Sequence, residues 1–159
     1  MKQDKIYIYG KHALTEALRN NPRAVDRIFT SSALEGELAT LVKKAGIRTD
    51  KLSGNSMPGE MQRNATHQGL IGRVSLAALV RPYKEFIETL KVTPDTCVIV
   101  LGELQDPHNV GAVIRSAAAF GVAAVFIPEH KQAPVTGAVV KVSAGMAFRV
   151  PLVQIGNVN

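Results

Sequence analysis

The sequence predicts an α/β protein made of two units, and two observations support this fold class. Short runs rich in Ile, Val, Tyr and Phe alternate with amphipathic helical segments along residues 1–75. Three continuous apolar runs, separated by further helical segments, follow in residues 96–159. Continuous apolar runs are typical of parallel strands covered on both faces. The pattern therefore favours a small parallel or mixed sheet followed by a second, parallel sheet, each covered by helices.

The first unit shows strands and helices in alternation. Gly10 stops the first strand, and Asn20-Asn21-Pro22 ends the helix that follows it. Gly46 stands at the expected stop of the second helix. The expected strands are 6–9, 25–30, 47–52 and 69–74. The expected helices are 12–19, 34–45 and a short one at 57–63.

A connector is expected at residues 76–95, because Pro82 and Pro94 there bracket only a short helical piece. In the second unit, Cys97 lies in the first apolar run and is expected to be a buried structural thiol. That run is expected to be a central strand buried on both faces. The strands predicted for this unit are 96–101, 123–127 and 150–155, and its helices are 110–120 and 136–147.

Composition excludes several classes of protein. Hydrophobic residues make up 46% and charged residues 20%, as in a globular protein and not a disordered one. No apolar run approaches the ~18–20 residues of a membrane span, and the N-terminus carries no secretion signal. One cysteine excludes an internal disulfide, so a cytoplasmic protein is expected. No His, Cys, Asp and Glu cluster has metal-ligand spacing, so no metal site is expected.

The positive charge is concentrated in the first part of the chain. The net charge is +6, and residues 1–93 contain 15 Lys/Arg against 9 Asp/Glu, whereas residues 94–159 contain 4 of each sign. A basic part beside a neutral part suggests that the basic part holds a polyanion such as nucleic acid. Charge alone fits equally well with solubilising Lys and Arg on a small domain.

The segment 104–122, LQDPHNVGAVIRSAAAFGV, carries the most chemical information. Asn109 is predicted to be the N-cap of a helix, since its side chain can accept a hydrogen bond from a free backbone N–H. Arg115 lies roughly 140° around that helix from the centre of its apolar stripe, so it is expected to point away from the core. It is expected near the sheet end where parallel α/β proteins bind ligands, with a helix N-terminus close by to favour phosphate. The expected buried stripe is Val110, Val113, Ile114 and Ala117.

Spacing alone leaves simpler explanations open. Arg115 is then a solvated surface arginine and Asn109 only a helix cap. His108, in a Pro-His-Asn turn, is more often structural than a catalytic base. No GxGxxG follows a strand, so the usual dinucleotide fingerprint is absent.

The same segment resembles the first signature motif of the SpoU/TrmH family (SPOUT superfamily) of RNA 2′-O-ribose methyltransferases. Further on, the run that begins at Lys141, KVSAGMA, resembles the family's Lys-x-Ser/Ala-x-Gly-Ala segment, and an apolar strand with a terminal asparagine follows at 150–157. The motif order Asp-Pro-x-Asn-x-Gly-x-x-x-Arg-x-Ala-x-x-x-Gly is met at Asp106, Pro107, Asn109, Gly111, Arg115, Ala117 and Gly121.

The N-terminal part is similar to the ribosomal-RNA, RlmB-like members of that family. The run from Tyr9 to Leu14, YGKHAL, resembles their Gly-x-His-Ala-Val opening, and His67-Gln68-Gly69 resembles their His-Gln-Gly element. The resemblance covers essentially the whole chain. It implies that RNA contacts Lys11, His12, His67 and Gln68.

The resemblance also implies the fold and the reaction. Residues 1–75 would form a small α/β/α RNA-binding domain of ribosomal-protein type, 76–95 a linker, and 96–159 the N-terminal part of an α/β-knot methyltransferase domain. The family transfers a methyl group from S-adenosylmethionine to a ribose 2′-OH. Its catalytic motif residues map to Asn109 and Arg115. The implied substrate is a guanosine in large-subunit ribosomal RNA, with transfer RNA as the alternative.

Two motifs of the family are absent from the chain, a Gly-x-Glu-x-x-Gly loop and a Ser-Leu-Asn-Val-Ser run. Both are expected beyond Asn159, where the family forms its knot, most of the cofactor pocket and much of its homodimer interface. An unpaired sheet edge with exposed apolar surface is therefore expected here. A catalytically inactive RNA-binding module is the alternative function. An unrelated α/β nucleotide-binding protein is the third hypothesis, which salt-dependent RNA binding would separate from the other two.

Overall fold

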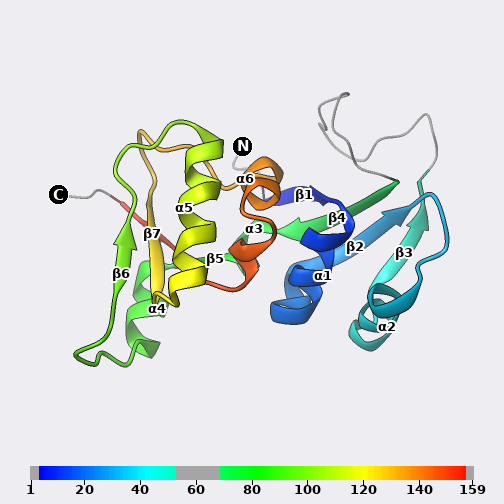
Figure 1. The fold of residues 1–159 in the computed structure, drawn as a ribbon, viewed down its shortest axis with the longest axis horizontal. Coiled ribbons are helices and arrows are strands. Elements are labelled where there is room, and N and C mark those ends of the chain that lie inside the picture. The colour runs from blue at the N-terminus through cyan, green and yellow to red at the C-terminus, as the bar shows by residue number, and fades with distance from the viewer. Residues whose placement is uncertain (1–3, 53–68, 157–159) are drawn as a thin grey trace.

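The computed structural model describes residues 4–52 and 69–156, which form two four-stranded sheets with helices packed against each (Figure 1). The predicted α/β class and its division into two sheets are confirmed. No helix in the described ranges is long and apolar enough to cross a membrane.

The first sheet is mixed and has the strand order β1-β4-β2-β3. Its strands are β1 (Lys5–Tyr9), β2 (Val25–Thr30), β3 (Arg48–Lys51) and β4 (Leu70–Ser75). β4 runs antiparallel to both β1 and β2, whereas β2 and β3 are parallel. β1, β2 and β3 therefore all finish at the same end of the sheet, where β4 begins.

Helices α1 (Lys11–Asn20) and α2 (Gly36–Ala45) pack beside each other against this sheet, with a short 3-10 turn, η1 (Pro22–Ala24), after α1 (Figure 1). α2 ends at Gly46, which adopts the left-handed conformation (φ 65°) that favours glycine. The helix expected at 57–63 lies outside the described residues. The apolar faces that these helices bury are Ala13, Leu14, Ala17 and Leu18 in α1 and Leu38 and Val42 in α2.

Part of the segment expected to be a connector is built into the second sheet. After a single turn, α3 (Leu76–Leu79), the strand β5 (Val80–Pro82) pairs in parallel with β8 (Leu152–Ile155). The helix α4 (Tyr83–Thr89) then packs on this sheet through Phe86, which meets Phe126 edge-to-face at 5.9 Å between ring centroids. Pro82 ends β5 and is the N-cap of α4.

The second sheet is parallel throughout, with the order β5-β8-β7-β6. The remaining strands are β6 (Val98–Val100) and β7 (Ala124–Pro128), and the remaining helical segments are α5 (Pro107–Phe120), α6 (Gly137–Val142) and η2 (Met146–Phe148). Val125 and Leu152 belong to the core shared with α5, whereas Ala124 and Val153 pack with Phe86 of α4. Because side chains alternate along a strand, α5 and α4 cover opposite faces.

The prediction of a fully buried strand at 96–101 is wrong, and so is the prediction of a buried thiol at Cys97. Cys97 is exposed, and Val98 and Val100 are 38% and 46% exposed. Among the described residues β6 pairs only with β7, so it is an edge strand. A continuous apolar run has the same sequence whether a strand lies in the centre or at the edge. The expected unpaired edge with exposed apolar surface is present here.

One hydrophobic core runs through both units. Ile6 and Ile8 of the first sheet belong to the same buried cluster as Val139 and Val140 of α6. The two sheets therefore share an interior, and the segment between them is not the only part that joins them.

Candidate functional site

The motif helix α5 begins earlier than expected, and Asn109 does not cap it. Asp106 is the N-cap, and its Oδ1 accepts a hydrogen bond from the backbone N–H of His108 at 2.8 Å. Pro107 occupies the first helical position, where a missing N–H costs nothing. Asn109 is thus the third residue of the helix and is exposed. Asp106 and Asn109 have the same capping chemistry. Only the backbone path decides which of the two caps the helix.

Arg115 lies on the solvent side of α5, as the helical spacing predicted. Val110, Ile114 and Ala117 are fully buried, whereas Arg115 is exposed and has no hydrogen bond or ion pair with another described residue. It stands eight residues after Pro107, about 12 Å along the helix axis. The helix N-terminus is therefore not beside it, contrary to our expectation. The guanidinium is free to take an anion from solution.

Two of the residues expected to bind RNA, Lys11 and His12, lie at the end of the first sheet where β1, β2 and β3 finish. The backbone N–H of Gly10 donates to Leu70 O at 3.3 Å, which holds the start of α1 beside the start of β4. Lys11 and His12 follow and are exposed. His67 and Gln68 lie outside the described residues, directly before Gly69. Lys11 and Gly69 line the same hollow, so the described ends of the two motif segments lie close together.

A hollow of about 370 Å³ opens at this end of the sheet. Lys11 lines it together with Thr30, Ser32 and Leu34. The Thr30 hydroxyl donates to Ser32 O at 2.7 Å and so fixes the turn after β2. Sequence reasoning missed Thr30 and Ser32, although both stand where a predicted strand ends, which is where parallel sheets place their ligands.

Ion pairs decide which cations of the first unit are available to a ligand. Lys5 and Arg73 pair with Asp26 on the strand face, and Arg27 and Arg48 pair with Asp50. Burial raises the pKa of Asp26, but hydrogen bonds from Arg73 and Lys5 outweigh it and lower that pKa overall. In the described part of the chain, the unpaired cations include Lys11, Lys43 and Lys51. The last two line neighbouring hollows that share Thr30 and Ser32.

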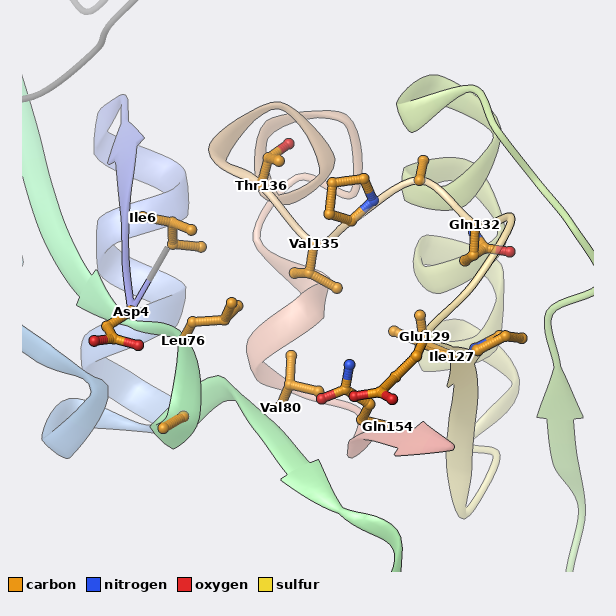
Figure 2. A pocket seen from close by; sticks show the side chains of 14 residues that line it. Asp4, Ile6, Leu76, Val80, Ile127, Glu129, Gln132, Val135, Thr136 and Gln154 are labelled. Carbon is orange, nitrogen blue, oxygen red and sulfur yellow. The ribbon is translucent and has the colours of Figure 1, made fainter. Parts of the chain in front are cut away.

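A second hollow, also of about 370 Å³, lies between the two units (Figure 2). It sits beside the ends of β7 and β8, with Ile127 and Gln154 on one side and Ile6 on the other. Its charged side chains are the carboxylates of Asp4 and Glu129, which repel phosphate. Neither Asn109 nor Arg115 lines this hollow or the hollows around Thr30.

Two family models match the chain in the order of its two units. Residues 7–80 match the RNA 2′-O ribose methyltransferase substrate-binding domain, and residues 96–159 match the SpoU rRNA methylase family. With the motif helix and the N-terminal motif segments described above, these matches place the chain in the SpoU/TrmH family of RNA 2′-O-ribose methyltransferases.

Similar proteins agree with this assignment. The 23S rRNA (guanosine-2′-O-)-methyltransferase RlmB of Vibrio cholerae is 34% identical over 94% of this chain, and that of Acinetobacter baylyi is 32% identical over 95%. The chain spans 62% of the length of each.

Solved structures share the fold. The AdoMet complex of the SpoU methyltransferase AviRb from Streptomyces viridochromogenes has a TM-score of 0.71 at 20% identity, covering 97% of this chain and 56% of that one. The AdoMet-bound rRNA methyltransferase from Sinorhizobium meliloti has a TM-score of 0.73 at 16% identity, covering 96% and 55%.

The cap assignment predicts a loss of stability on substitution of Asp106 and almost none on substitution of Asn109. Asp106→Ala should lower the free energy of unfolding by about 1 kcal/mol, because a backbone N–H at the start of α5 loses its acceptor. Asn109→Ala should change it by less than about 0.5 kcal/mol, because Asn109 is exposed and does not cap. Urea denaturation followed by circular dichroism measures both. A larger loss for Asn109→Ala than for Asp106→Ala would contradict the assignment.

Proposed function

We propose that this chain is part of an enzyme that transfers a methyl group from S-adenosylmethionine to a ribose 2′-OH of RNA. The first unit would bind the RNA, and α5 would present Arg115 and Asn109 to the reacting ribose. The observation that carries the proposal is the exposed and unpaired Arg115 on the motif helix. A surface arginine with no partner among the described residues is available to bind a phosphate bidentately.

Arg115 would act by binding and by electrostatics, and not as a base. A guanidinium stays protonated at neutral pH, so it has no lone pair ready to take the ribose proton. It can hold the phosphate next to the target ribose and stabilise the negative charge that develops on the attacking oxygen. Asn109 lies on the same helix and is exposed, so its amide is available to the same ligand. S-adenosylmethionine, when bound, supplies the electrophilic methyl group.

None of the four hollows described above is lined by Arg115. The hollow between the two units is near the ends of β7 and β8, but Arg115 is not part of its lining. Methyl transfer needs donor and acceptor held in contact, so a hollow that excludes the motif helix is not arranged for it. We therefore expect the cofactor site in the part of the relatives that this chain does not span.

We propose RNA as the partner of the unpaired lysines at the end of the first sheet where β1, β2 and β3 finish. A guanosine of large-subunit ribosomal RNA is the proposed target, since the RlmB relatives named above act on 23S rRNA guanosine. Transfer RNA is the alternative target. We further propose that the complete enzyme works as a homodimer in the cytoplasm. A catalytically inactive RNA-binding module is the competing function, favoured by the position of Arg115 outside the hollows described above.

Calorimetry with S-adenosylmethionine tests the division of labour. This chain should give no heat of binding at micromolar concentration, whereas a version extended by the two absent motifs should bind. Binding by the extended version alone supports a methyltransferase whose site is split between segments. Micromolar binding by this chain would show that residues before Asn159 hold the cofactor, and binding by neither would favour the inactive module.

RNA binding should depend on the unpaired lysines. Lys11→Ala and Lys51→Ala should each reduce the slope of log affinity against log salt by about 1, since each removes one phosphate contact. Lys5→Ala removes the same charge from the same unit but from a side chain paired with Asp26, so it should leave the slope unchanged. Fluorescence anisotropy with a labelled ribosomal-RNA hairpin measures all three. Equal slopes for the parent and both test variants would place the RNA elsewhere.

Arg115→Ala in the extended version should lower kcat by about 10²–10³, the usual effect of losing one transition-state charge stabiliser. Thermal stability should not change, because the side chain is exposed and unpaired. Arg81→Ala, a substitution at an exposed arginine of β5, serves as the control for charge. Methyl incorporation from labelled cofactor provides the rate. Full activity of Arg115→Ala would rule out a role for this residue.

A further inference from the structure

The segment α6–η2 (137–148) is shared between the RNA-binding unit and the motif helix. On one side it contacts β1 and α1, and on the other it contacts α5. On the α5 side, a Cβ at Gly111 would come within 2.7 Å of Val142 Cβ and 3.0 Å of Val139 O. Neither atom lies at the end of a flexible side chain, so α5 and α6 are at their closest approach.

The contact with the first unit is equally close. A Cβ at Gly137 would collide with the carbonyl oxygen of Tyr7, and one at Gly145 would lie 2.9 Å from Glu16 Cβ. Gly145 also has φ 80°, which other residues rarely adopt. The ammonium of Lys141 lies 5.0 Å from the ring centroid of Tyr9. Two segments that the sequence marked as motifs, one in each unit, therefore meet at this interface.

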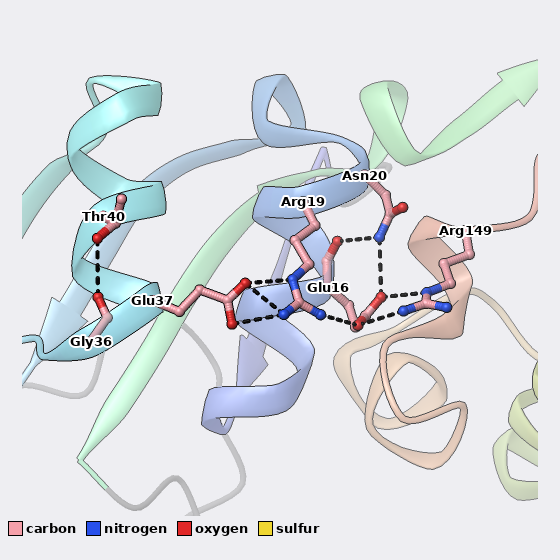
Figure 3. Close-up of polar contacts among 7 residues, drawn as sticks. All are labelled: Glu16, Arg19, Asn20, Gly36, Glu37, Thr40 and Arg149. Atoms are coloured by element: carbon pink, nitrogen blue, oxygen red, sulfur yellow. Dashed lines mark hydrogen bonds and ion pairs between the residues drawn. The ribbon is translucent and has the colours of Figure 1, made fainter.

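A bidentate ion pair closes the interface (Figure 3). Arg149, the residue after η2, donates from Nε to Glu16 Oε2 at 2.5 Å and from Nη2 to Oε1 at 2.9 Å. Asn20 also donates to Oε2 at 3.1 Å, and Arg19 lies 3.5 Å from Oε1. Glu16 is 8% exposed, so its charge depends on these partners for compensation.

The partners act unequally on this carboxylate. The hydrogen bond from Arg149 is the main reason that the pKa of Glu16 is lowered, and burial opposes it. The contribution of the Glu16 carboxylate to folding stability is therefore complete above the ordinary pKa of a glutamate. It is lost as the pH falls through the lowered pKa of Glu16. Arg19 instead engages Glu37 of α2 through two bonds of 2.7 Å, within its own unit. Arg149 is thus the arginine that links Glu16 to the second unit.

We propose that Glu16 and Arg149 are positioning residues that lock the RNA-binding unit onto α6–η2 and so set where bound RNA meets Arg115. This role rests on the proposed function, whereas the lock itself does not. Lys11 lies in α1, α1 contacts η2, and α6–η2 contacts α5. Glycines lie at the close contacts between these segments, and the Glu16–Arg149 ion pair joins α1 to the residue after η2. Neither family resemblance nor the motif residues assign a role to this pair.

Spin labels test the lock without RNA. One label goes on the native Cys97, which is exposed in the second unit, and one on Ala45→Cys, which is exposed at the end of α2. The parent should give a single narrow distance distribution. Arg149→Met removes the charge from a side chain that is 47% exposed, and it should broaden the distribution while circular dichroism stays unchanged. Arg19→Met, which removes the other arginine from Glu16, should leave it narrow.

Charge exchange gives the second test. The double variant Glu16→Arg with Arg149→Glu should restore the narrow distribution that Arg149→Glu alone loses, because the pair is remade with the charges reversed. A purely structural effect of either side chain would not be repaired in this way. An unchanged distribution in Arg149→Met and Arg149→Glu would overturn the lock.

A crosslinking measurement tests positioning. A benzoylphenylalanine placed at Ser116, next to Arg115, should crosslink to bound RNA in the parent chain. Arg149→Met should cut the yield about tenfold at equal RNA occupancy, because the RNA is still bound but no longer held at a set distance. An unchanged yield with a broadened distribution would overturn positioning and leave the lock. Absence of RNA binding in the parent would instead refute the proposed function.

Discussion

The arrangement of the whole chain depends on the close packing of α6–η2 between two partners. α5 approaches it at Gly111, and the first unit approaches it at Gly137 and Gly145. At such contacts an added methyl group has no space, so the segments pack with little freedom to slide. The close packing and the Glu16–Arg149 ion pair act on the same interface, and the ion pair adds a directional contact to it.

Electrostatic pairing divides the basic residues of the first unit into two groups. Arginines on the strand face are neutralised by Asp26 and Asp50, which stabilises the sheet surface and removes those charges from ligand binding. Lysines at the carboxyl ends of the strands, such as Lys11 and Lys51, stay unpaired among the described residues. The net charge of +6 therefore does not show which cations a polyanion can use, because that depends on which of them are ion-paired.

The family motifs have two kinds of physical role in this structure. Gly111 and Gly145 serve packing, since each lets one segment approach another without a side chain between them. Arg115 and Asn109 are exposed and contribute nothing visible to packing, which leaves both side chains accessible from solution. Lys141 combines a polar contact with a place in the packed interface. Its ammonium lies over the Tyr9 ring, and its helix forms the interface.

The sequence by itself determined the α/β class, the order of most elements outside residues 76–95 and the solvent-facing position of Arg115, because hydrophobic periodicity and helix stops are local signals. It did not determine that Asp106 caps α5, since Asn109 has the same capping chemistry and only the backbone path distinguishes them. It could not show that Val98 and Val100 lie on an edge strand, because exposure depends on which strands are neighbours. The ion pair of Glu16 with Arg149 spans 133 residues, and only tertiary packing brings such distant charges together.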